Sequence, residues 1–160
     1  MTPARLCHHP DWWRVRDVMS SPVAAVAPSA TYEEMVDLLL AHQISGLAVT
    51  DGTGRLLGVV TEADLVRLEA HRPAPAGRAS FAGAATTSAP VDSRTATAAG
   101  LMSCPVVTAS PDDDLPTIAR KLLDSGHRRL PVVAADGRLV GVVSRRDLLV
   151  PAWDDSAARR

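Results

Sequence analysis

The feature that most constrains the fold of this chain is an internal repeat without gaps. A shift of 83 positions aligns residues 18–65 with residues 101–148, and about a third of the aligned residues are identical. The clearest match is between two octets, GVVTEADL at 58–65 and GVVSRRDL at 141–148. A unit of about 50 residues is too small to bury a good core alone. The repeat therefore predicts two similar subdomains that pack against each other.

Each copy is predicted to begin with a short strand and a helix. The stretches PVAAVA (22–27) and PVVTAS (105–110) are typical of short strands. In the first copy, Thr31 and Glu34 have the spacing of a capping box, which marks the start of a helix. In the second copy, Asp114 can cap the helix and Gly126 ends it.

A hairpin and a second helix complete each predicted unit. LAVT and LPVV are typical of strands, DGTG and AADG of turns, and RLLGVV and RLVGVV of the returning strands. A second helix is expected to begin at Thr61 or at Ser144. The predicted fold class is therefore α/β (α+β), with two β-α-β-β-α repeats packed sheet to sheet with pseudo-twofold symmetry.

Composition divides the chain further. Between the copies, 22 of the 27 residues from 73 to 99 are Ala, Pro, Gly, Ser or Thr. Such a stretch buries too little apolar area to become ordered, so we expect a flexible linker. The expected organisation is an N-terminal segment (1–13), a first repeat (14–70), a linker (71–96), a second repeat (97–150) and a C-terminal tail (151–160).

Charge and hydropathy exclude several classes of function. The formal net charge is −1, which is not the basic excess of a nucleic-acid-binding surface. No apolar run is long enough to cross a membrane, and the N-terminus lacks the apolar region of a signal peptide, so we expect a cytoplasmic protein. No nucleophile–base pairing or nucleotide-cofactor fingerprint is present, so we do not expect an enzyme. Cys7, His8 and His9 could form part of a metal site, but their position beside a proline near the terminus favours an incidental cluster.

The two octets carry residue types that suit a nucleotide. A helix that begins at Thr61 would offer unpaired backbone N–H groups and a positive dipole end to a phosphate, and the hydroxyl would add a donor. Asp64 would follow one turn later as a carboxylate acceptor for a vicinal diol such as a ribose. Ser144 and Asp147 repeat this arrangement. The alternative is that both pairs are only capping-box variants.

In these residues the chain resembles tandem cystathionine-β-synthase (CBS) domains, known as a CBS pair or Bateman module, of the stand-alone bacterial type. The resemblance rests on VMSSPV, ISGLAVTDGTGRLLGVVTEADL, LMSCPVVTASPDD and HRRLPVVAADGRLVGVVSRRDLL in this order. It implies two clefts between the repeats that bind AMP, ADP, ATP or S-adenosylmethionine, with no required cofactor. It also implies a homodimeric disc and an effector protein, which the sequence does not identify.

The resemblance assigns residues to each cleft. In the family, one repeat contacts the base and the octet of the other repeat holds the ribose and phosphate. The implied main cleft has base contacts at Ala24, Ile44 and Ser45, and opposite them Ser144, Arg145, Arg146 and Asp147, with Arg128 and Arg129 at the phosphate corner. The implied second cleft has Val107 and His127 on the base side and Thr61 and Asp64 opposite.

Charge predicts that the two clefts differ. Residues 18–65 contain one arginine and six acidic residues, whereas residues 101–148 contain seven basic and six acidic residues. Arginine binds phosphate in a bidentate manner, so a charged nucleotide should favour the Asp147 cleft. The leading hypothesis is a regulatory module that senses adenosine ligands. The alternative is a ligand-free interaction or oligomerisation module with vestigial clefts.

Overall fold

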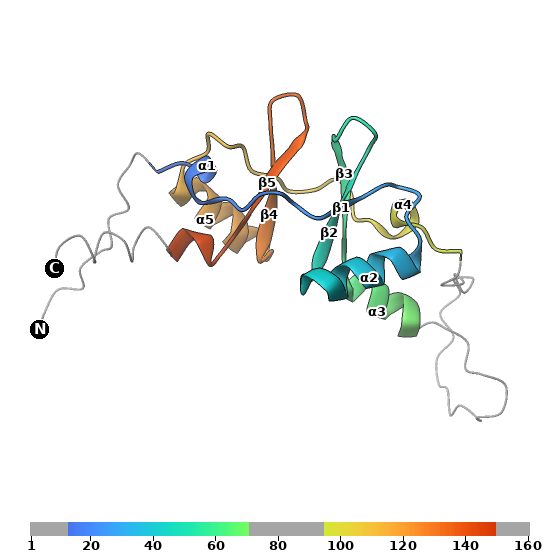
Figure 1. Ribbon diagram of the computed structural model, residues 1–160. Coiled ribbons are helices and arrows are strands. Elements are labelled where there is room, and N and C mark those ends of the chain that lie inside the picture. Colours follow the sequence, from blue (N-terminus) through green and yellow to red (C-terminus); the bar gives the residue numbers. More distant parts are fainter. Residues whose placement is uncertain (1–12, 71–94, 150–160) are drawn as a thin grey trace, which may run out of the picture. The chain divides into compact units, whose positions relative to one another are not determined.

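The computed structural model describes residues 13–70 and 95–149, which form two compact units (Figure 1). The N-terminal unit comprises Ala24–Asp51 and Leu57–Pro105. The C-terminal unit comprises Met1–Val23, Gly52–Leu56 and Val106–Arg160, so it takes in two segments from the first half of the sequence. Most of the predicted linker, the predicted tail and the Cys7-His8-His9 cluster lie outside the described residues. Among the described helices, none has the length and apolar character needed to cross a membrane.

The N-terminal unit is built on a three-stranded sheet with the strand order β1-β2-β3, and β1 runs parallel to β2. Thr31 and Glu34 form the predicted capping box at the start of α2, and Gln43 ends this helix in the left-handed conformation. The elements are β1 (Ala25–Val26), α2 (Tyr32–His42), β2 (Gly46–Thr50), β3 (Leu56–Thr61), α3 (Glu62–Ala70) and α4 (Ala98–Leu101).

The C-terminal unit contains an antiparallel hairpin and one longer helix. Asp114 caps this helix by accepting a hydrogen bond from the Thr117 N–H, and Gly126 follows its end with a φ of 71°. Both features agree with the predictions. The elements are α1 (Val15–Val18), α5 (Leu115–Asp124), β4 (Arg129–Val133), β5 (Leu139–Ser144) and the 3-10 helix η1 (Asp147–Leu149).

The second repeat differs from its prediction at both ends. The stretch 105–110 forms no strand and pairs only through a single parallel bridge between Ala109 and Val132. The prediction of an α-helix that begins at Ser144 is also wrong. Within the described residues, a turn after Ser144 leads into the 3-10 helix η1. Pro151 gives the physical reason: it has no N–H to donate, its ring clashes with the carbonyl of Asp147 in a helix, and it disfavours the α conformation at the residue before it.

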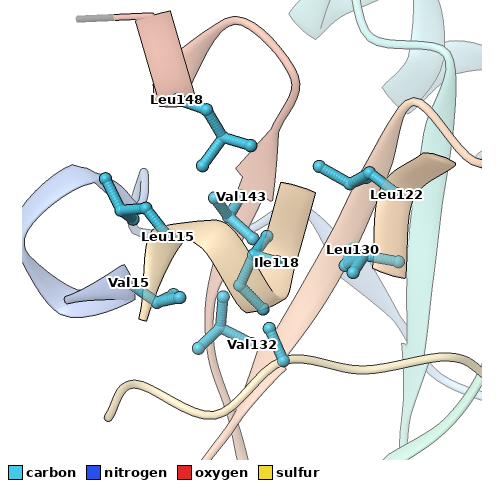
Figure 2. Close-up of a cluster of buried hydrophobic side chains, with 9 residues drawn as sticks. Val15, Leu115, Ile118, Leu122, Leu130, Val132, Val143 and Leu148 are labelled. Carbon is cyan, nitrogen blue, oxygen red and sulfur yellow. The ribbon is translucent and has the colours of Figure 1, made fainter. Parts of the chain in front are cut away.

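Each unit has its own apolar core. Most residues of one core correspond to residues of the other under the shift of 83 positions. Figure 2 shows the core of the C-terminal unit, in which the side chains of α5 meet those of β4, β5 and η1. Seven core positions correspond between the units: Val26 and Ala109, Met35 and Ile118, Leu39 and Leu122, Leu47 and Leu130, Val49 and Val132, Val60 and Val143, and Leu65 and Leu148. The repeat in the sequence is therefore a repeat of core packing.

The short helices α1 and α4 are exchanged between the repeats. They correspond under the same shift, yet Val15 of α1 is buried in the core of the C-terminal unit, and Ala98 of α4 in the core of the N-terminal unit. The Val15 N–H donates to the Asp113 carbonyl at 3.0 Å, and the Ala98 N–H donates to the Ala30 carbonyl at 2.9 Å. Each core is therefore completed by a segment that belongs, in the sequence, to the other repeat.

The tip of the β2–β3 hairpin also belongs to the C-terminal unit. Arg55 forms an antiparallel bridge with Arg138, its counterpart in the second repeat. Two backbone hydrogen bonds frame the bridge: Leu56 N–H donates to the Gly137 carbonyl at 3.1 Å, and Leu139 N–H donates to the Gly54 carbonyl at 3.0 Å. Gly54 and Gly137 have φ values of 82° and 83°, a conformation that glycine adopts without steric cost.

Candidate functional site

The Thr61 turn of the N-terminal unit joins β3 to α3. Asp64 Oδ2 accepts hydrogen bonds from the Thr61 backbone N–H at 2.9 Å and from the Thr61 hydroxyl at 2.6 Å. The hydroxyl proton is therefore committed to the carboxylate of its own turn, and the hydroxyl oxygen keeps only its acceptor capacity. In this state Thr61 does not supply the phosphate donor that the sequence suggested.

The Ser144 turn of the C-terminal unit has the same internal geometry. Asp147 Oδ2 accepts from the Ser144 backbone N–H at 2.7 Å and from the Ser144 hydroxyl at 2.8 Å. Both aspartates are partly buried. The capping alternative is thus satisfied in both repeats, but it occupies only one oxygen of each carboxylate. The other oxygen, Oδ1, decides what each turn offers to a ligand.

The two Oδ1 atoms have different surroundings. Asp64 Oδ1 accepts a hydrogen bond from the Arg67 guanidinium at 2.7 Å, in an ion pair whose side chains are 15% and 71% exposed. Asp147 Oδ1 has no such partner among residues 13–70 and 95–149. The position equivalent to Arg67 is Val150, which carries no charge. Of the two aspartates in the octets, therefore, only Asp147 has a carboxylate oxygen without a partner in the described part of the chain.

Arg67 was not among the residues singled out from the sequence. The sequence nevertheless indicates its ion pair with Asp64, because an acidic and a basic residue three positions apart on a helix lie on the same face.

The four arginines predicted for the main cleft, Arg128, Arg129, Arg145 and Arg146, have different roles. Arg145 binds carbonyl oxygens: its Nε donates to His127 at 3.1 Å and its Nη2 to Leu122 at 3.3 Å. It thereby satisfies carbonyls at the end of α5, where a positive charge also suits the helix dipole. The other three side chains of this group, those of Arg128, Arg129 and Arg146, form no hydrogen bond or ion pair with any described residue. All three are exposed.

The backbone brings these arginines to the Ser144 turn. Arg129 is the register partner of Ser144 across the β4–β5 hairpin. The Arg145 N–H donates to the Arg128 carbonyl at 3.1 Å. Arg128 and Arg129 therefore flank the turn in the folded C-terminal unit, although 15 or more positions separate them from it in the sequence. The equivalent positions beside the Thr61 turn are Ser45 and Gly46, which are uncharged.

The predicted base-contacting residues are divided between the units. Ala24, Ile44 and Ser45 lie in the N-terminal unit and are all half-buried. Ser45 is beside the Thr61 turn, because the Glu62 N–H donates to the Ser45 carbonyl at 3.2 Å. Val107 and His127 lie in the C-terminal unit and are exposed. Their grouping with the turn of the opposite repeat stays a prediction.

The described residues hold no cluster of three or more metal-ligating side chains. The free thiol among them, that of Cys104, is exposed.

The protein-family model for the CBS domain matches the chain twice, at residues 15–71 and 98–150. The chain belongs to the CBS-domain family. The two matches fall on the two repeats, so the recognition of a tandem CBS pair is confirmed, and its mixed α/β fold agrees with the solved structures of such pairs.

Several CBS proteins resemble the chain over most of its length. The CBS domain-containing protein YhcV of Bacillus subtilis is 28% identical over 90% of this chain and 89% of its own. The crystal structure of CBSX2, a protein of Arabidopsis thaliana, in complex with AMP has a TM-score of 0.71 at 25% identity and covers 90% of this chain and 98% of CBSX2.

The cytosolic domain of the Mg²⁺ channel MgtE in complex with ATP has a TM-score of 0.63 at 30% identity, over 82% of this chain and 46% of that one. The chain spans less than two thirds of the length of several curated relatives that it matches, for example 56% of the chloroplastic CBSX1 of Arabidopsis thaliana.

Proposed function

We propose that this CBS pair is a regulatory module that binds an adenosine-containing ligand, and that the Ser144 turn of the C-terminal unit is its main ribose and phosphate contact. The observation that carries the proposal is the uncommitted Oδ1 of Asp147 beside three exposed arginines without ion-pair partners among the described residues. A carboxylate oxygen suits a ribose diol, and guanidinium groups suit phosphate. The AMP complex of CBSX2 and the ATP complex of MgtE support this ligand class.

The N-terminal unit is proposed to bind such a ligand more weakly. Arg67 holds Asp64 Oδ1, and the turn lacks basic neighbours equivalent to Arg128 and Arg129. A ligand with less negative charge than a nucleotide, such as S-adenosylmethionine, suits these surroundings better. The proposed base contacts remain Ala24, Ile44 and Ser45 for the main site and Val107 and His127 for the other.

Binding is proposed to act on a partner protein. A ligand shifts a conformational equilibrium only through its different affinities for the two states. A ligand that contacted both repeats would favour the state in which both sets of contacts form, and an effector that recognises this state would report occupancy. The proposed role is therefore regulatory and not catalytic.

Calorimetric titration and thermal unfolding against AMP, ADP, ATP, S-adenosylmethionine and NADH test the proposal. A ligand present at about 100 times its dissociation constant should stabilise the chain by about 2.7 kcal/mol. Two matched controls separate the contacts. A 2′,3′-dideoxyadenosine nucleotide should bind more weakly because it lacks the diol, and adenosine itself should bind more weakly because it lacks the phosphate. The absence of heat and of stabilisation across the whole panel would contradict ligand sensing.

The second candidate function is ligand-free assembly. It is favoured by the internal hydrogen bonds of both turns, which satisfy the hydroxyls without a ligand, and by exposed leucines on the helices of both units. In this case the chain would serve as a homodimerisation or docking module, and the ligand panel would give no response.

A further inference from the structure

The 107–110 segment of the C-terminal unit is held differently from its counterpart in the N-terminal unit. In the N-terminal unit, the Ala24 carbonyl accepts a hydrogen bond from the Ala48 N–H at 3.2 Å, and this bond is part of the pairing of β1 with β2. The residue equivalent to Ala48 is Pro131, which has no N–H to donate. The Val107 carbonyl therefore cannot receive the hydrogen bond that the Ala24 carbonyl receives.

The backbone pairing of this segment with β4 is complete only at Ala109. The Ala109 N–H donates to the Pro131 carbonyl at 2.9 Å, and the Val133 N–H donates to the Ala109 carbonyl at 2.9 Å. The Ala109 side chain belongs to the core of the C-terminal unit and is 1% exposed, whereas Val107 is 39% exposed. The residues before Ala109 therefore need another contact to fix their position.

The side chain of Lys121, on α5, supplies such a contact. Its Nζ atom donates to the Thr108 carbonyl at 3.3 Å and to Asp113 Oδ2 at 3.0 Å. The same Asp113 oxygen accepts a hydrogen bond from the Ser110 N–H at 3.0 Å. Lysine suits this role because its ammonium group has three donors and can serve a carbonyl and a carboxylate together. The ion pair thus fastens two backbone groups of the 107–110 segment to α5.

The N-terminal unit has apolar residues at the equivalent positions. Leu38 corresponds to Lys121 and packs against the apolar core, and Ala30 corresponds to Asp113 and is buried in that core. The ion pair therefore occurs in the repeat in which Pro131 removes the strand hydrogen bond. The repeat that keeps this hydrogen bond has no charge at either position.

We propose that Lys121 is a positioning residue. It replaces the strand hydrogen bond that Pro131 removes, and it thereby sets the position of Val107, the base contact proposed for the weaker site. The role of Val107 rests on the proposed function, whereas the contact of Lys121 with the 107–110 segment does not. Because an ion pair and not the sheet holds the segment, loss of one charge should loosen the base contact of this site alone.

Residue-resolved hydrogen exchange of the full chain without ligand tests the contact. Lys121→Met removes the charge, and it should speed exchange of the Ala109 and Ser110 N–H groups by about three- to tenfold, a modest factor because Lys121 is partly exposed. Lys121→Arg should stay within about twofold of wild type, since a guanidinium group also offers several donors. The matched control is Arg120→Met, which removes the exposed charge next to Lys121 and should leave both rates unchanged.

A second substitution tests whether Lys121 replaces the missing strand hydrogen bond. Pro131→Ala supplies the absent N–H, so that the Val107 carbonyl can be paired as the Ala24 carbonyl is. In this background, Lys121→Met should change the exchange rates by less than about twofold. The proposal is overturned if Lys121→Met leaves exchange unchanged in the wild-type background, or if its effect is equal with and without Pro131→Ala.

Two ligand titrations test the role of Val107. In an Asp147→Asn background, which weakens the main site, Lys121→Met should lower the affinity for S-adenosylmethionine by about three- to tenfold, and Lys121→Arg should restore it. In the wild-type background, Lys121→Met should leave the affinity for AMP within about twofold, because the Ser144 turn does not use the 107–110 segment. General damage to the C-terminal unit would weaken both ligands, since the Ser144 turn lies in the same unit.

The possible failures can be told apart. Equal weakening of both ligands, or unchanged binding of S-adenosylmethionine, would overturn the positioning role. A chain that binds neither ligand would contradict the proposed function and with it the role of Val107. The exchange rates would still decide whether Lys121 holds the segment.

Discussion

Met102 packs against Gly58 so closely that a Cβ atom on Gly58 would lie 2.5 Å from the Met102 Sδ atom. Met19 and Gly141 repeat this relationship, with a corresponding distance of 2.6 Å. Each methionine precedes a serine that pairs with the strand next to the glycine, Ser103 with Val59 and Ser20 with Val142. The glycine shared by the two octets therefore has a packing role that is separate from ligand binding.

Gly58→Ala and Gly141→Ala should each destabilise the fold, because the added methyl group overlaps the methionine side chain. We expect a cost of about 1–3 kcal/mol in denaturant unfolding. Met102→Ala should relieve part of the cost of Gly58→Ala in a double-mutant cycle. The matched control is Gly52→Ala, whose methyl group would meet no atom within 4 Å. Equal effects of Gly58→Ala and Gly52→Ala would contradict the packing role.

Because α1 and α4 are exchanged, removal of the N-terminal residues should affect elements of the second repeat. A chain that begins at residue 24 lacks Val15 and the Ser20 bridge, both of which belong to the C-terminal unit. Hydrogen exchange should then speed up in β4, β5 and α5, although these elements are intact in sequence. A chain that begins at Trp13 keeps every described residue and serves as the control. Unchanged protection of β4 and β5 in the shorter chain would show that the exchanged segment is dispensable.

Asp147→Asn should weaken nucleotide binding by about 10- to 100-fold, which is the range for the loss of a hydrogen bond to a charged group. Asparagine keeps one acceptor oxygen for the Ser144 turn and replaces the other carboxylate oxygen. Asp64→Asn should have a small effect on the same ligand, because Asp64 Oδ1 is already paired with Arg67. Calorimetric titration measures both. A larger loss from Asp64→Asn would reverse the proposed order of the two turns.

Arg67→Ala should increase the affinity of the Thr61 turn for any ligand that it binds, by up to about fivefold. The gain is limited because an exposed ion pair contributes only about 0.2–1 kcal/mol. The same substitution in an Asp64→Ala background should change nothing, since the carboxylate that Arg67 occupies is then absent. Weaker binding by Arg67→Ala would instead indicate that the guanidinium contacts the ligand.

The cap of α5 predicts a pH dependence of stability. The Thr117 backbone N–H, 2.7 Å from Asp114 Oδ1, is the main cause that lowers the pKa of Asp114 below its ordinary value of 3.8. Because the folded pKa is the lower one, the unfolded chain takes up the proton first as the pH falls. The stabilisation is therefore complete well above 3.8 and is lost as the pH falls through the folded pKa.

Asp114→Ala should accordingly lower the melting temperature at pH 7, and the difference from wild type should narrow in acid. Asp124→Ala, at the other end of α5, is the control and should not lower it, since a carboxylate there opposes the helix dipole. A difference between Asp114→Ala and wild type that stayed constant down to acid pH would contradict the role of the charge.

Local signals in the sequence were sufficient for the parts of the fold that local chemistry decides. Thr31 with Glu34, Asp114 and Gly126 marked helix ends because caps need those residue types. The exchange of α1 and α4 was not predictable in this way. Two repeats with equivalent cores offer a four-residue helix two similar places, and nothing in VRDV or AAGL indicates which one it fills.

The residue types of the candidate site could be predicted from the sequence, but the hydrogen bonds and ion pairs of its side chains could not. The hydroxyl and carboxylate of each octet do lie together. The internal use of the hydroxyl protons and the role of Arg145 at the end of α5 depend on side-chain directions that spacing does not determine. The absence of an α-helix after Ser144 has a local signal in the sequence, because Pro151 disfavours a helix over the residues before it.

The exchanged helices also bear on how such a chain can arise. If the short helix keeps the exchanged position seen here, a polypeptide with a single copy of the repeat lacks the segment that fills its own core. It would find that segment only on a second polypeptide, and its folding would then depend on concentration. Joining two copies in one chain makes the encounter intramolecular, with an effective concentration fixed by the connecting segment. The duplication in the sequence thus replaces an obligate association by a covalent one and leaves each copy free to diverge, as the charges of the two octets have done.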